Sequence, residues 1–225
     1  MAADGTEARD PRAVSEGPAP RRTLAHPWII SLVAALGLAG TTVVARRRPI
    51  PGFEVDVNRA INGAPDWVAR TLWPVMQLGT LWAPILIAVV IGWWGRNRLL
   101  AVCLVVAELF TWTSVHLLKE AVDRGRPPVY LDDVVVRDGV ARGLGFPSGH
   151  SATAAMTALV CMAAVPRRHR WALVVVAVAV GIARIVHGVH LPADVIGGWS
   201  YGVLVGVATL AVYDRIRARR AAPVG

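Results

Sequence analysis

The stretch at residues 99–118, LLAVCLVVAELFTWTSVHLL, decides the fold class of this chain. It holds a single charged residue, Glu108, and is about as long as the roughly 20 apolar residues with which an α-helix crosses a bilayer. Backbone N–H and C=O groups find no water in lipid, so a segment of this kind has to bond internally as a helix. The stretch therefore predicts a transmembrane helix.

Five further apolar blocks repeat this pattern along the chain. The chain is 55% hydrophobic, which is above the share typical of soluble domains. One block carries two prolines, Pro74 and Pro84, which are expected to kink its helix. The prediction is an all-α integral membrane protein with a bundle of six transmembrane helices. The further blocks lie at residues 27–45, 72–94, 151–165 (short for a span), 171–189 and 195–213.

Composition divides the chain into three parts. Residues 1–25 are rich in Ala, Pro, Gly and charge without a hydrophobic period, which predicts a disordered cytoplasmic leader. Residues 26–214 form the membrane domain, and residues 215–225 form a basic cytoplasmic tail. The loop at 46–71 contains an amphipathic stretch at 55–61, which either lies along the outer interface or is a plain connection.

Positive charge is concentrated between the apolar blocks. The net charge is +9, and a basic chain binds either nucleic acid or an anionic membrane or substrate. No soluble segment remains to carry a nucleic-acid motif, so no nucleic-acid partner is expected. Arginines at 96–98, at 167–170 and in the tail outweigh those at 46–48, so the positive-inside rule places both termini in the cytoplasm. The Arg- and Ala-rich composition indicates a bacterial chain in the inner (plasma) membrane.

Three polar clusters stand at the ends of these blocks. They are KEAVDRGRP at 119–127, PSGH at 147–150 and RIVHGVHLPAD at 184–194. In chain order, the third block (99–118) ends at the side of the membrane at which the fourth (151–165) begins. The fifth block (171–189) ends at this side as well. Counting spans therefore puts all three clusters at one face of the membrane, the outer face.

The polar residues of these clusters suit a phosphate group. Lys119 and Arg126 supply positive charge, and a guanidinium binds phosphate oxygens in pairs. Ser148 and Gly149 precede a helix whose free backbone N–H groups favour an anion. Gly149 permits close approach, while Ser148 adds a hydroxyl donor, a helix cap or both. Arg184 lies near the membrane end of a helix, where an unpaired charge is costly and so indicates a function.

His190 and His150 are suited to different catalytic roles. Asp194 follows His190 by four residues, and because Pro192 interrupts the helix, a turn has to pair them. A carboxylate that accepts from one ring nitrogen leaves the other as a nucleophile, the role predicted for His190. His150 is predicted to protonate the leaving alkoxide as general acid. His187 is a competing nucleophile, but it lacks the Asp spacing and is expected to pack.

Other polar residues in the apolar blocks have structural interpretations. His116 lies one turn before Lys119 and is expected to pack rather than face the site. Glu108 is expected to bond between helices, although an alternative is that it balances Arg184. Cys103 and Cys161 are expected to be small packing residues.

The three clusters resemble those of the type-2 phosphatidic acid phosphatase family, which includes lipid phosphate phosphatases and is related to vanadium haloperoxidases. The family pattern is Lys-x6-Arg-Pro, Pro-Ser-Gly-His and Ser-Arg-x5-His-x3-Asp. Ala183 stands where the family has Ser. The resemblance covers roughly residues 119–194 and implies catalysis without a metal or cofactor, in agreement with the lack of a carboxylate cluster suited to magnesium. The matching residues are Lys119, Arg126, Pro127, Pro147, Ser148, Gly149, His150, Arg184, His190 and Asp194.

The predicted function is therefore a membrane phosphatase that hydrolyses a lipid phosphate or diphosphate through a phosphohistidine intermediate on His190. Candidate substrates are phosphatidate, phosphatidylglycerol phosphate and a polyprenyl mono- or diphosphate, and an outward-facing bacterial site favours the polyprenyl carrier. One alternative is a phosphotransferase that uses an acceptor other than water. Another is a non-catalytic lipid-binding or transport protein, against which the presence of His190 and Asp194 argues.

Overall fold

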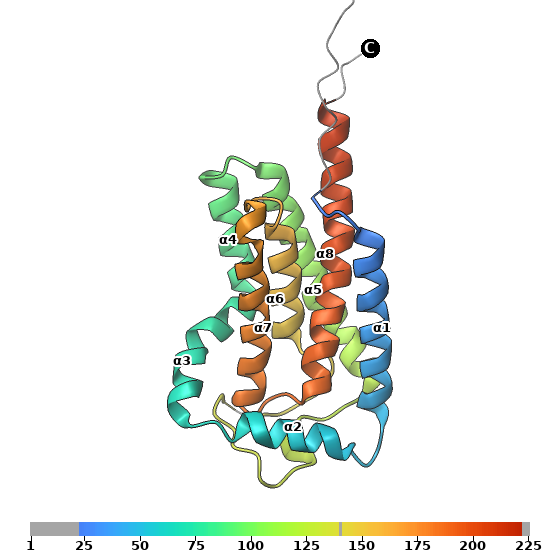
Figure 1. The fold of residues 1–225 in the computed structure, drawn as a ribbon, viewed down its shortest axis with the longest axis vertical. Coiled ribbons are helices and arrows are strands. Elements are labelled where there is room, and N and C mark those ends of the chain that lie inside the picture. The colour runs from blue at the N-terminus through green and yellow to red at the C-terminus, as the bar shows by residue number, and fades with distance from the viewer. Residues whose placement is uncertain (1–22, 140, 222–225) are drawn as a thin grey trace, which may run out of the picture.

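The computed structural model describes residues 23–139 and 141–221, which fold into a bundle of α-helices without any strand in these ranges (Figure 1). The predicted all-α class is confirmed. Helix α2 lies across one end of the bundle, and α3 leads from it back toward α4. The α-helices are α1 (Pro27–Arg46), α2 (Gly52–Asn62), α3 (Asp66–Met76), α4 (Trp82–Trp93), α5 (Arg98–Val122), α6 (Gly149–Cys161), α7 (Arg170–Val186) and α8 (Pro192–Ala221).

Four of these segments are long and apolar enough to cross a membrane. They contain α1, α5, α7 and α8, and the bent pair α3–α4 counts as a fifth if its two parts form one span. Helix α6 has 13 residues, which is short for a span. The described helices thus give four or five candidate spans, and the count of six stays a prediction.

The block at 72–94 is broken rather than kinked at its prolines. Its two helices meet at 64° across the 3-10 turn Gln77–Gly79, while Pro74 lies inside α3 and Pro84 lies in the first turn of α4. Proline is tolerated in a first turn because its missing N–H has no helical partner there. The prediction of one helix over this block is wrong. A Cβ at Gly79 would lie 2.7 Å from the backbone oxygen of His150, so the break packs against the start of α6.

Helix α6 is the central element of the bundle. Its residues Ala152, Met156 and Val160 are fully buried. Helix α8 approaches it through two glycines, because a Cβ at Gly202 would lie 2.1 Å from the Ala152 carbonyl oxygen and one at Gly198 would lie 2.4 Å from that of Ser148. This close contact holds the beginning of α6 beside the beginning of α8.

The amphipathic stretch predicted at 55–61 lies within α2, so it is not a plain connection. The polar residues Glu54, Asn58 and Asn62 are buried against the bundle, whereas Phe53 and Val57 are exposed. Their spacing of four places the three polar side chains on one face of the helix. Helix α2 therefore binds the bundle through polar contacts.

The predicted leader and tail fall partly beyond what the structure describes. Residues 1–22 and 222–225 lie outside the described residues. Helix α8 continues to Ala221, so residues 215–221 of the predicted tail extend this helix. At the same end of the bundle, the Thr23 hydroxyl donates to Asp214 Oδ1 at 2.9 Å.

Candidate active site

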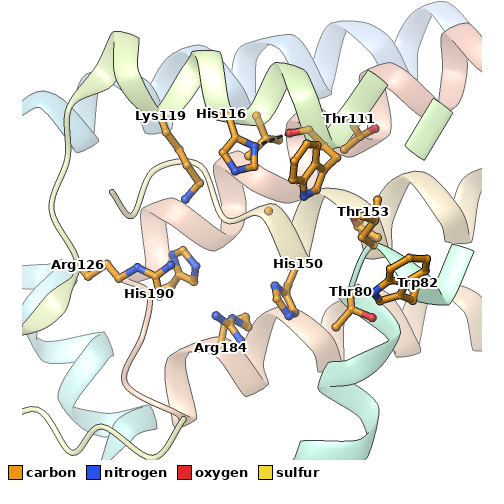
Figure 2. A pocket seen from close by; sticks show the side chains of 15 residues that line it. Thr80, Trp82, Thr111, His116, Lys119, Arg126, His150, Thr153, Arg184 and His190 are labelled. Carbon is orange, nitrogen blue, oxygen red and sulfur yellow. Dashed lines mark hydrogen bonds between the residues drawn. The ribbon is translucent and has the colours of Figure 1, made fainter. Parts of the chain in front are cut away.

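A cavity of about 360 Å³ lies between α4, α5, α6 and α7. The three predicted clusters meet here, although they come from different elements (Figure 2). In the described part of the chain, no Asp or Glu is among the residues that line this cavity. The predicted site residues that do line it are Lys119, Arg126, Gly149, His150, Arg184 and His190.

Lys119 ties α5 to the segment that precedes α6. Its Nζ donates to the carbonyl oxygens of Leu144 at 2.8 Å and Gly145 at 3.4 Å. Helix α5 ends three residues later, because Asp123 adopts a left-handed conformation. The chain then turns back and brings Arg126 to the same cavity.

Two arginines present unused donors at this cavity. The buried Nε atoms of Arg126 and Arg184 have no hydrogen-bond partner among the described residues. Burial lowers the pKa of the Arg126 guanidinium, while Asp194 and Asp138 act to raise it. A buried donor without an acceptor is costly, so a bound anion would satisfy both groups.

Asp138 is a neighbour of Arg184 that the sequence analysis missed. Its Oδ2 accepts from Arg184 Nη1 at 3.0 Å. The aspartate belongs to the long connection between α5 and α6, and no local spacing relates it to α7. Only the fold brings the two together.

Ser148 caps α6 rather than lining the cavity. Its fully buried hydroxyl oxygen accepts from the Ser151 N–H at 3.4 Å, and its own N–H donates to the Asp194 carbonyl oxygen at 2.8 Å. The cap function expected for Ser148 is present, and its role as a phosphate donor stays a prediction. Gly149 follows at the cavity, and a Cβ there would meet Val115 alone among the described residues, at 3.7 Å.

His190 lies in the connection between α7 and α8, as the position of Pro192 predicts. Pro192 is the first residue of α8, a position that suits proline. His190 Nδ1 lies 3.4 Å from Asp194 Oδ2, which also accepts from the Leu191 N–H at 2.9 Å. A carboxylate only accepts, so this pairing assigns the proton to Nδ1 and leaves Nε2 with the lone pair of a nucleophile.

The surroundings of His190 favour its neutral form. Burial, together with the nearby cations Arg184, Lys119 and Arg126, holds the pKa of His190 well below its ordinary value. Desolvation and neighbouring positive charge both disfavour an imidazolium. His190 is therefore neutral near pH 7, which is the form that attacks an electrophile.

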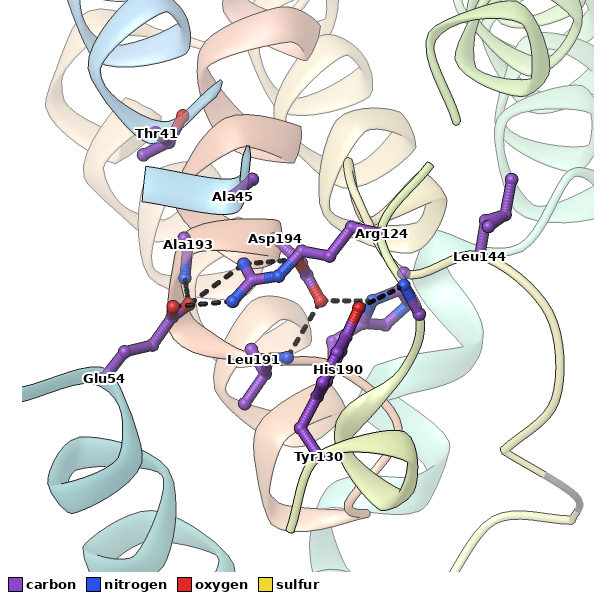
Figure 3. A network of polar contacts seen from close by, with 12 residues as sticks. Thr41, Ala45, Glu54, Arg124, Tyr130, Leu144, His190, Leu191, Ala193 and Asp194 are labelled. Carbon is purple, nitrogen blue, oxygen red and sulfur yellow. Dashed lines mark hydrogen bonds and ion pairs between the residues drawn. The ribbon is translucent and has the colours of Figure 1, made fainter. Parts of the chain in front are cut away.

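A buried ion network behind His190 also escaped the sequence analysis (Figure 3). Arg124 Nη1 donates to Asp194 Oδ1 at 3.0 Å, and the guanidinium also binds the carboxylate of Glu54. All three side chains are fully buried. Arg124 stands inside the first cluster, two residues before Arg126, and that position was its available signal.

The remaining polar residues either form hydrogen bonds within the bundle or line the cavity. His187 Nδ1 donates to the Ala183 carbonyl oxygen at 2.7 Å, away from this cavity. Glu108 accepts from Thr153 on α6 at 2.9 Å, which is a bond between helices rather than a partner for Arg184. His116 lines the cavity, so the packing role expected for it is wrong.

The described part of the chain contains no obvious metal-binding site. In these residues, no group of three or more His, Cys, Asp and Glu side chains is arranged to hold a metal ion. The chemistry available at the cavity is that of cations, imidazoles and the backbone N–H groups of α6.

Comparisons with known proteins place these features in context. The chain is 33% identical over 111 residues to a lipid A 1-phosphatase of Rhizobium etli, a match that covers 48% of this chain and 47% of that protein. It is 24% identical over 133 residues to an undecaprenyl-diphosphatase of Sulfolobus acidocaldarius, covering 59% and 63% of the two chains. The chain thus spans about half the length of the first of these relatives.

Two solved structures share the fold. A PAP2 type phosphatidylglycerolphosphate phosphatase from Bacillus subtilis superposes with a TM-score of 0.63 at 23% identity, covering 86% of this chain and 98% of that one. LpxE of Aquifex aeolicus superposes with a TM-score of 0.57 at 24% identity, covering 70% and 94%. The family model of the PAP2 superfamily matches residues 98–218, which is more than half of the chain and includes all three clusters. The chain therefore belongs to the PAP2 superfamily.

Proposed function

We propose that this chain is a membrane phosphatase that hydrolyses a lipid phosphate or diphosphate through a phosphohistidine intermediate on His190. One observation carries the proposal. Three cations, Lys119, Arg126 and Arg184, surround a cavity that three histidines also line, and no carboxylate is among its described lining residues. This arrangement attracts a phosphate dianion and places a nucleophile beside it.

Phosphate binding uses groups of two kinds. The two guanidinium groups donate in pairs to phosphate oxygens, and Lys119 adds a point charge. The N-terminus of α6 supplies backbone N–H groups and the positive end of the helix dipole. These groups also offset the charge that develops on the equatorial oxygens during transfer.

The reaction proceeds in two steps. The bound phosphate dianion offsets the nearby cations and favours protonated His150. His190 Nε2 attacks phosphorus, the P–O bond to the lipid breaks, and the His150 imidazolium gives its proton to the leaving alkoxide. His150 then takes a proton from water, whose oxygen attacks phosphorus and breaks the P–N bond. Inorganic phosphate and the original imidazole result. Asp194 stabilises the positive charge that His190 carries in the intermediate, and no step uses a metal ion.

The shape of the cavity supports a lipid substrate. From the cationic end it extends to Thr80 and Trp82 at the beginning of α4 and to Thr111 and Trp112 on α5. The lipid phosphate would occupy the charged end, and its chain would lie along α4 and α5. The names of the relatives, which include a lipid A 1-phosphatase and an undecaprenyl-diphosphatase, support the same class of substrate. A polyprenyl diphosphate is our preferred substrate.

We place the site at the outer face of a bacterial inner membrane, with both termini in the cytoplasm. The proposed domain comprises residues 26–214 and six spans, with the α3–α4 pair and α6 added to the four long helices. Support for this orientation comes from the arginines at 96–98 and 167–170, which lie away from the site end.

Replacement of His190 tests the function. Purified wild-type protein in detergent is expected to release phosphate from a panel of phosphatidate, phosphatidylglycerol phosphate and undecaprenyl diphosphate. The variant His190→Ala is expected to lose activity by more than about 1,000-fold, because no intermediate forms. His169→Ala, an exposed histidine outside the cavity, is the matched control and is expected to keep wild-type turnover.

Reaction in 18O-labelled water identifies the acceptor. Hydrolysis places one solvent oxygen in the released phosphate, whereas phosphoryl transfer to another acceptor does not. Full turnover by His190→Ala would refute the mechanism, and no release from any substrate by wild-type protein would point to a binding or transport protein.

A further inference from the structure

We propose that Glu54 and Arg124 are positioning residues for the nucleophile. Glu54, on the crossing helix α2, holds Arg124, and Arg124 holds the Asp194 carboxylate that orients His190. The inference rests on the proposed role of His190 as nucleophile. It assigns a function to α2, which lies outside the family match at residues 98–218.

The two carboxylate oxygens of Asp194 bind different partners. Oδ2 faces the His190 imidazole at 3.4 Å and accepts from the Leu191 N–H at 2.9 Å. Oδ1 accepts from Arg124 Nη1 at 3.0 Å. With both oxygens engaged, the carboxylate has one orientation, and that orientation sets the plane of the imidazole (Figure 3).

Arg124 is held in turn by a two-point contact. Its Nη1 and Nη2 donate to Glu54 Oε1 at 3.1 Å and Oε2 at 2.6 Å. Burial acts to lower the pKa of Arg124, but Asp194 and Glu54 outweigh it and raise that pKa above the ordinary value. Arg124 is thus a permanent cation whose position is defined by two carboxylates.

Glu54 also binds the backbone at the beginning of α8. Its Oε1 accepts from the Ala193 N–H at 2.9 Å, next to Asp194 itself. A carboxylate at this end of a helix interacts favourably with free N–H groups and with the helix dipole. One side chain therefore fixes both the arginine and the turn that carries the His190–Asp194 pair.

Asn58 and Asn62, the other buried polar residues of α2, contact the α7–α8 connection. Asn58 Nδ2 lies 3.5 Å from the His190 carbonyl oxygen, and Asn62 Nδ2 donates to that of Val186 at 3.1 Å. Glu54, Asn58 and Asn62 are successive turns of one helix face. Helix α2 therefore supports the α7–α8 connection through polar contacts.

The charges of the network match the proposed chemistry. Two carboxylates and one guanidinium leave one negative charge beside an imidazole that becomes positive when the P–N bond forms. The other charged or titratable groups that face His190 are Arg184, Lys119, Arg126 and His150, and none of these supplies a negative charge. The network thus stabilises the intermediate without contacting the phosphate.

The test separates positioning from phosphate binding. We would measure kcat, KM and the pH dependence of kcat/KM with undecaprenyl diphosphate in detergent for the variants Glu54→Gln, Arg124→Gln, Arg124→Lys and the double variant. Arg59→Gln is the matched control, because Arg59 is also on α2 but its ion pair with Asp133 is exposed. His190→Ala is assayed alongside.

We expect kcat to fall at least tenfold in Glu54→Gln and Arg124→Gln while KM changes less than threefold, because the phosphate-binding cations are untouched. The double variant should be no worse than the poorer single variant, since both act through Asp194. Arg124→Lys should retain more activity than Arg124→Gln. Arg59→Gln should stay within twofold of wild type.

The pH profile provides a readout that a purely structural role would not move. Loss of the Arg124 cation favours protonated His190, so the acid limb should shift to higher pH in Arg124→Gln. Loss of the Glu54 anion acts in the opposite sense, so the limb should shift to lower pH in Glu54→Gln. Shifts of the same sign, or none, would overturn the inference.

Folding is checked by gel filtration and by thermal unfolding followed through Trp fluorescence. If Arg124→Gln does not fold, Arg124→Lys and Glu54→Asp, which keep every charge, carry the kcat test. Variants as active as Arg59→Gln, together with an inactive His190→Ala, would refute this inference alone. Full turnover by His190→Ala would instead refute the proposed function.

Discussion

Gly149 is a glycine that the surrounding packing does not require, and this points to a ligand at its position. A Cβ at this position meets no described atom closer than Val115 Cγ1 at 3.7 Å, which is ordinary contact. The fold therefore tolerates alanine here, whereas a phosphate held against the start of α6 does not. Gly145 differs, because a Cβ there would lie 2.8 Å from Asp194 Oδ2.

Gly149→Ala is accordingly expected to keep the wild-type melting temperature and to lower kcat/KM by roughly 10- to 100-fold, because the added methyl displaces the phosphate. Steady-state assays and thermal unfolding in detergent measure the two effects. Gly145→Ala should lower both activity and melting temperature. Wild-type kcat/KM in Gly149→Ala would show that no phosphate approaches this backbone.

Individual site residues differ in how far the sequence reveals them. Lys119, Arg126, His150 and His190 stand in short runs with regular spacing, and the structure brings all four to one cavity. Arg124 lies in the same run, but its burial and its partner Glu54 depend on a contact between residues 70 positions apart. No local pattern encodes such a pairing.

At the scale of elements, the contact between α6 and α8 positions the site. The cap of α6 and the first turn of α8 meet where Ser148 N donates to the Asp194 carbonyl oxygen. This approach requires glycine at positions 198 and 202, where a Cβ would overlap the backbone of α6. Small residues at helix contacts serve the same purpose in membrane bundles generally.

Gly202→Ala should therefore destabilise the fold by about 1–3 kcal/mol, since α6 and α8 must separate. Gly40→Ala is the matched control, because Gly40 lies inside α1 with no described atom within 4 Å of its Cβ position. Alanine at that site should be neutral or stabilise by up to about 1 kcal/mol. Thermal unfolding in detergent compares the two, and equal melting temperatures would contradict the packing argument.

Helix boundaries show what hydropathy does and does not encode. The apolar block at 27–45 coincides with α1, because composition alone selects a lipid-facing helix. The sequence predicted a kinked helix here, but not the break at Gln77–Gly79, where Gly79 packs against His150 on α6. A local scale of hydrophobicity contains no information on such a contact.

At the scale of the whole molecule, the site end and the terminal end are opposite. Helix α2 crosses one end of the bundle, while the beginning of α1 and the end of α8 lie toward the other (Figure 1). The proposed orientation puts α2 outside and both termini in the cytoplasm.

Cysteine labelling tests this orientation. In a Cys103→Ala/Cys161→Ala background, Asp132→Cys and Arg168→Cys place single thiols in exposed connections at the two ends. A membrane-impermeant maleimide should label Asp132→Cys in intact spheroplasts and Arg168→Cys only after permeabilisation. The cysteine-free parent controls for background, and the reverse pattern would invert the topology.

The all-α class, the polar clusters and their order could be predicted from the sequence, because hydropathy and motif spacing are local properties of the chain. Span counting also predicted that the clusters would meet. The folded chain was needed to reveal that Glu54 and Asp138 join them, that Ser148 is a buried cap and that α2 supports the His190 turn. These outcomes depend on which distant groups share a dry interior, where each buried charge needs a partner.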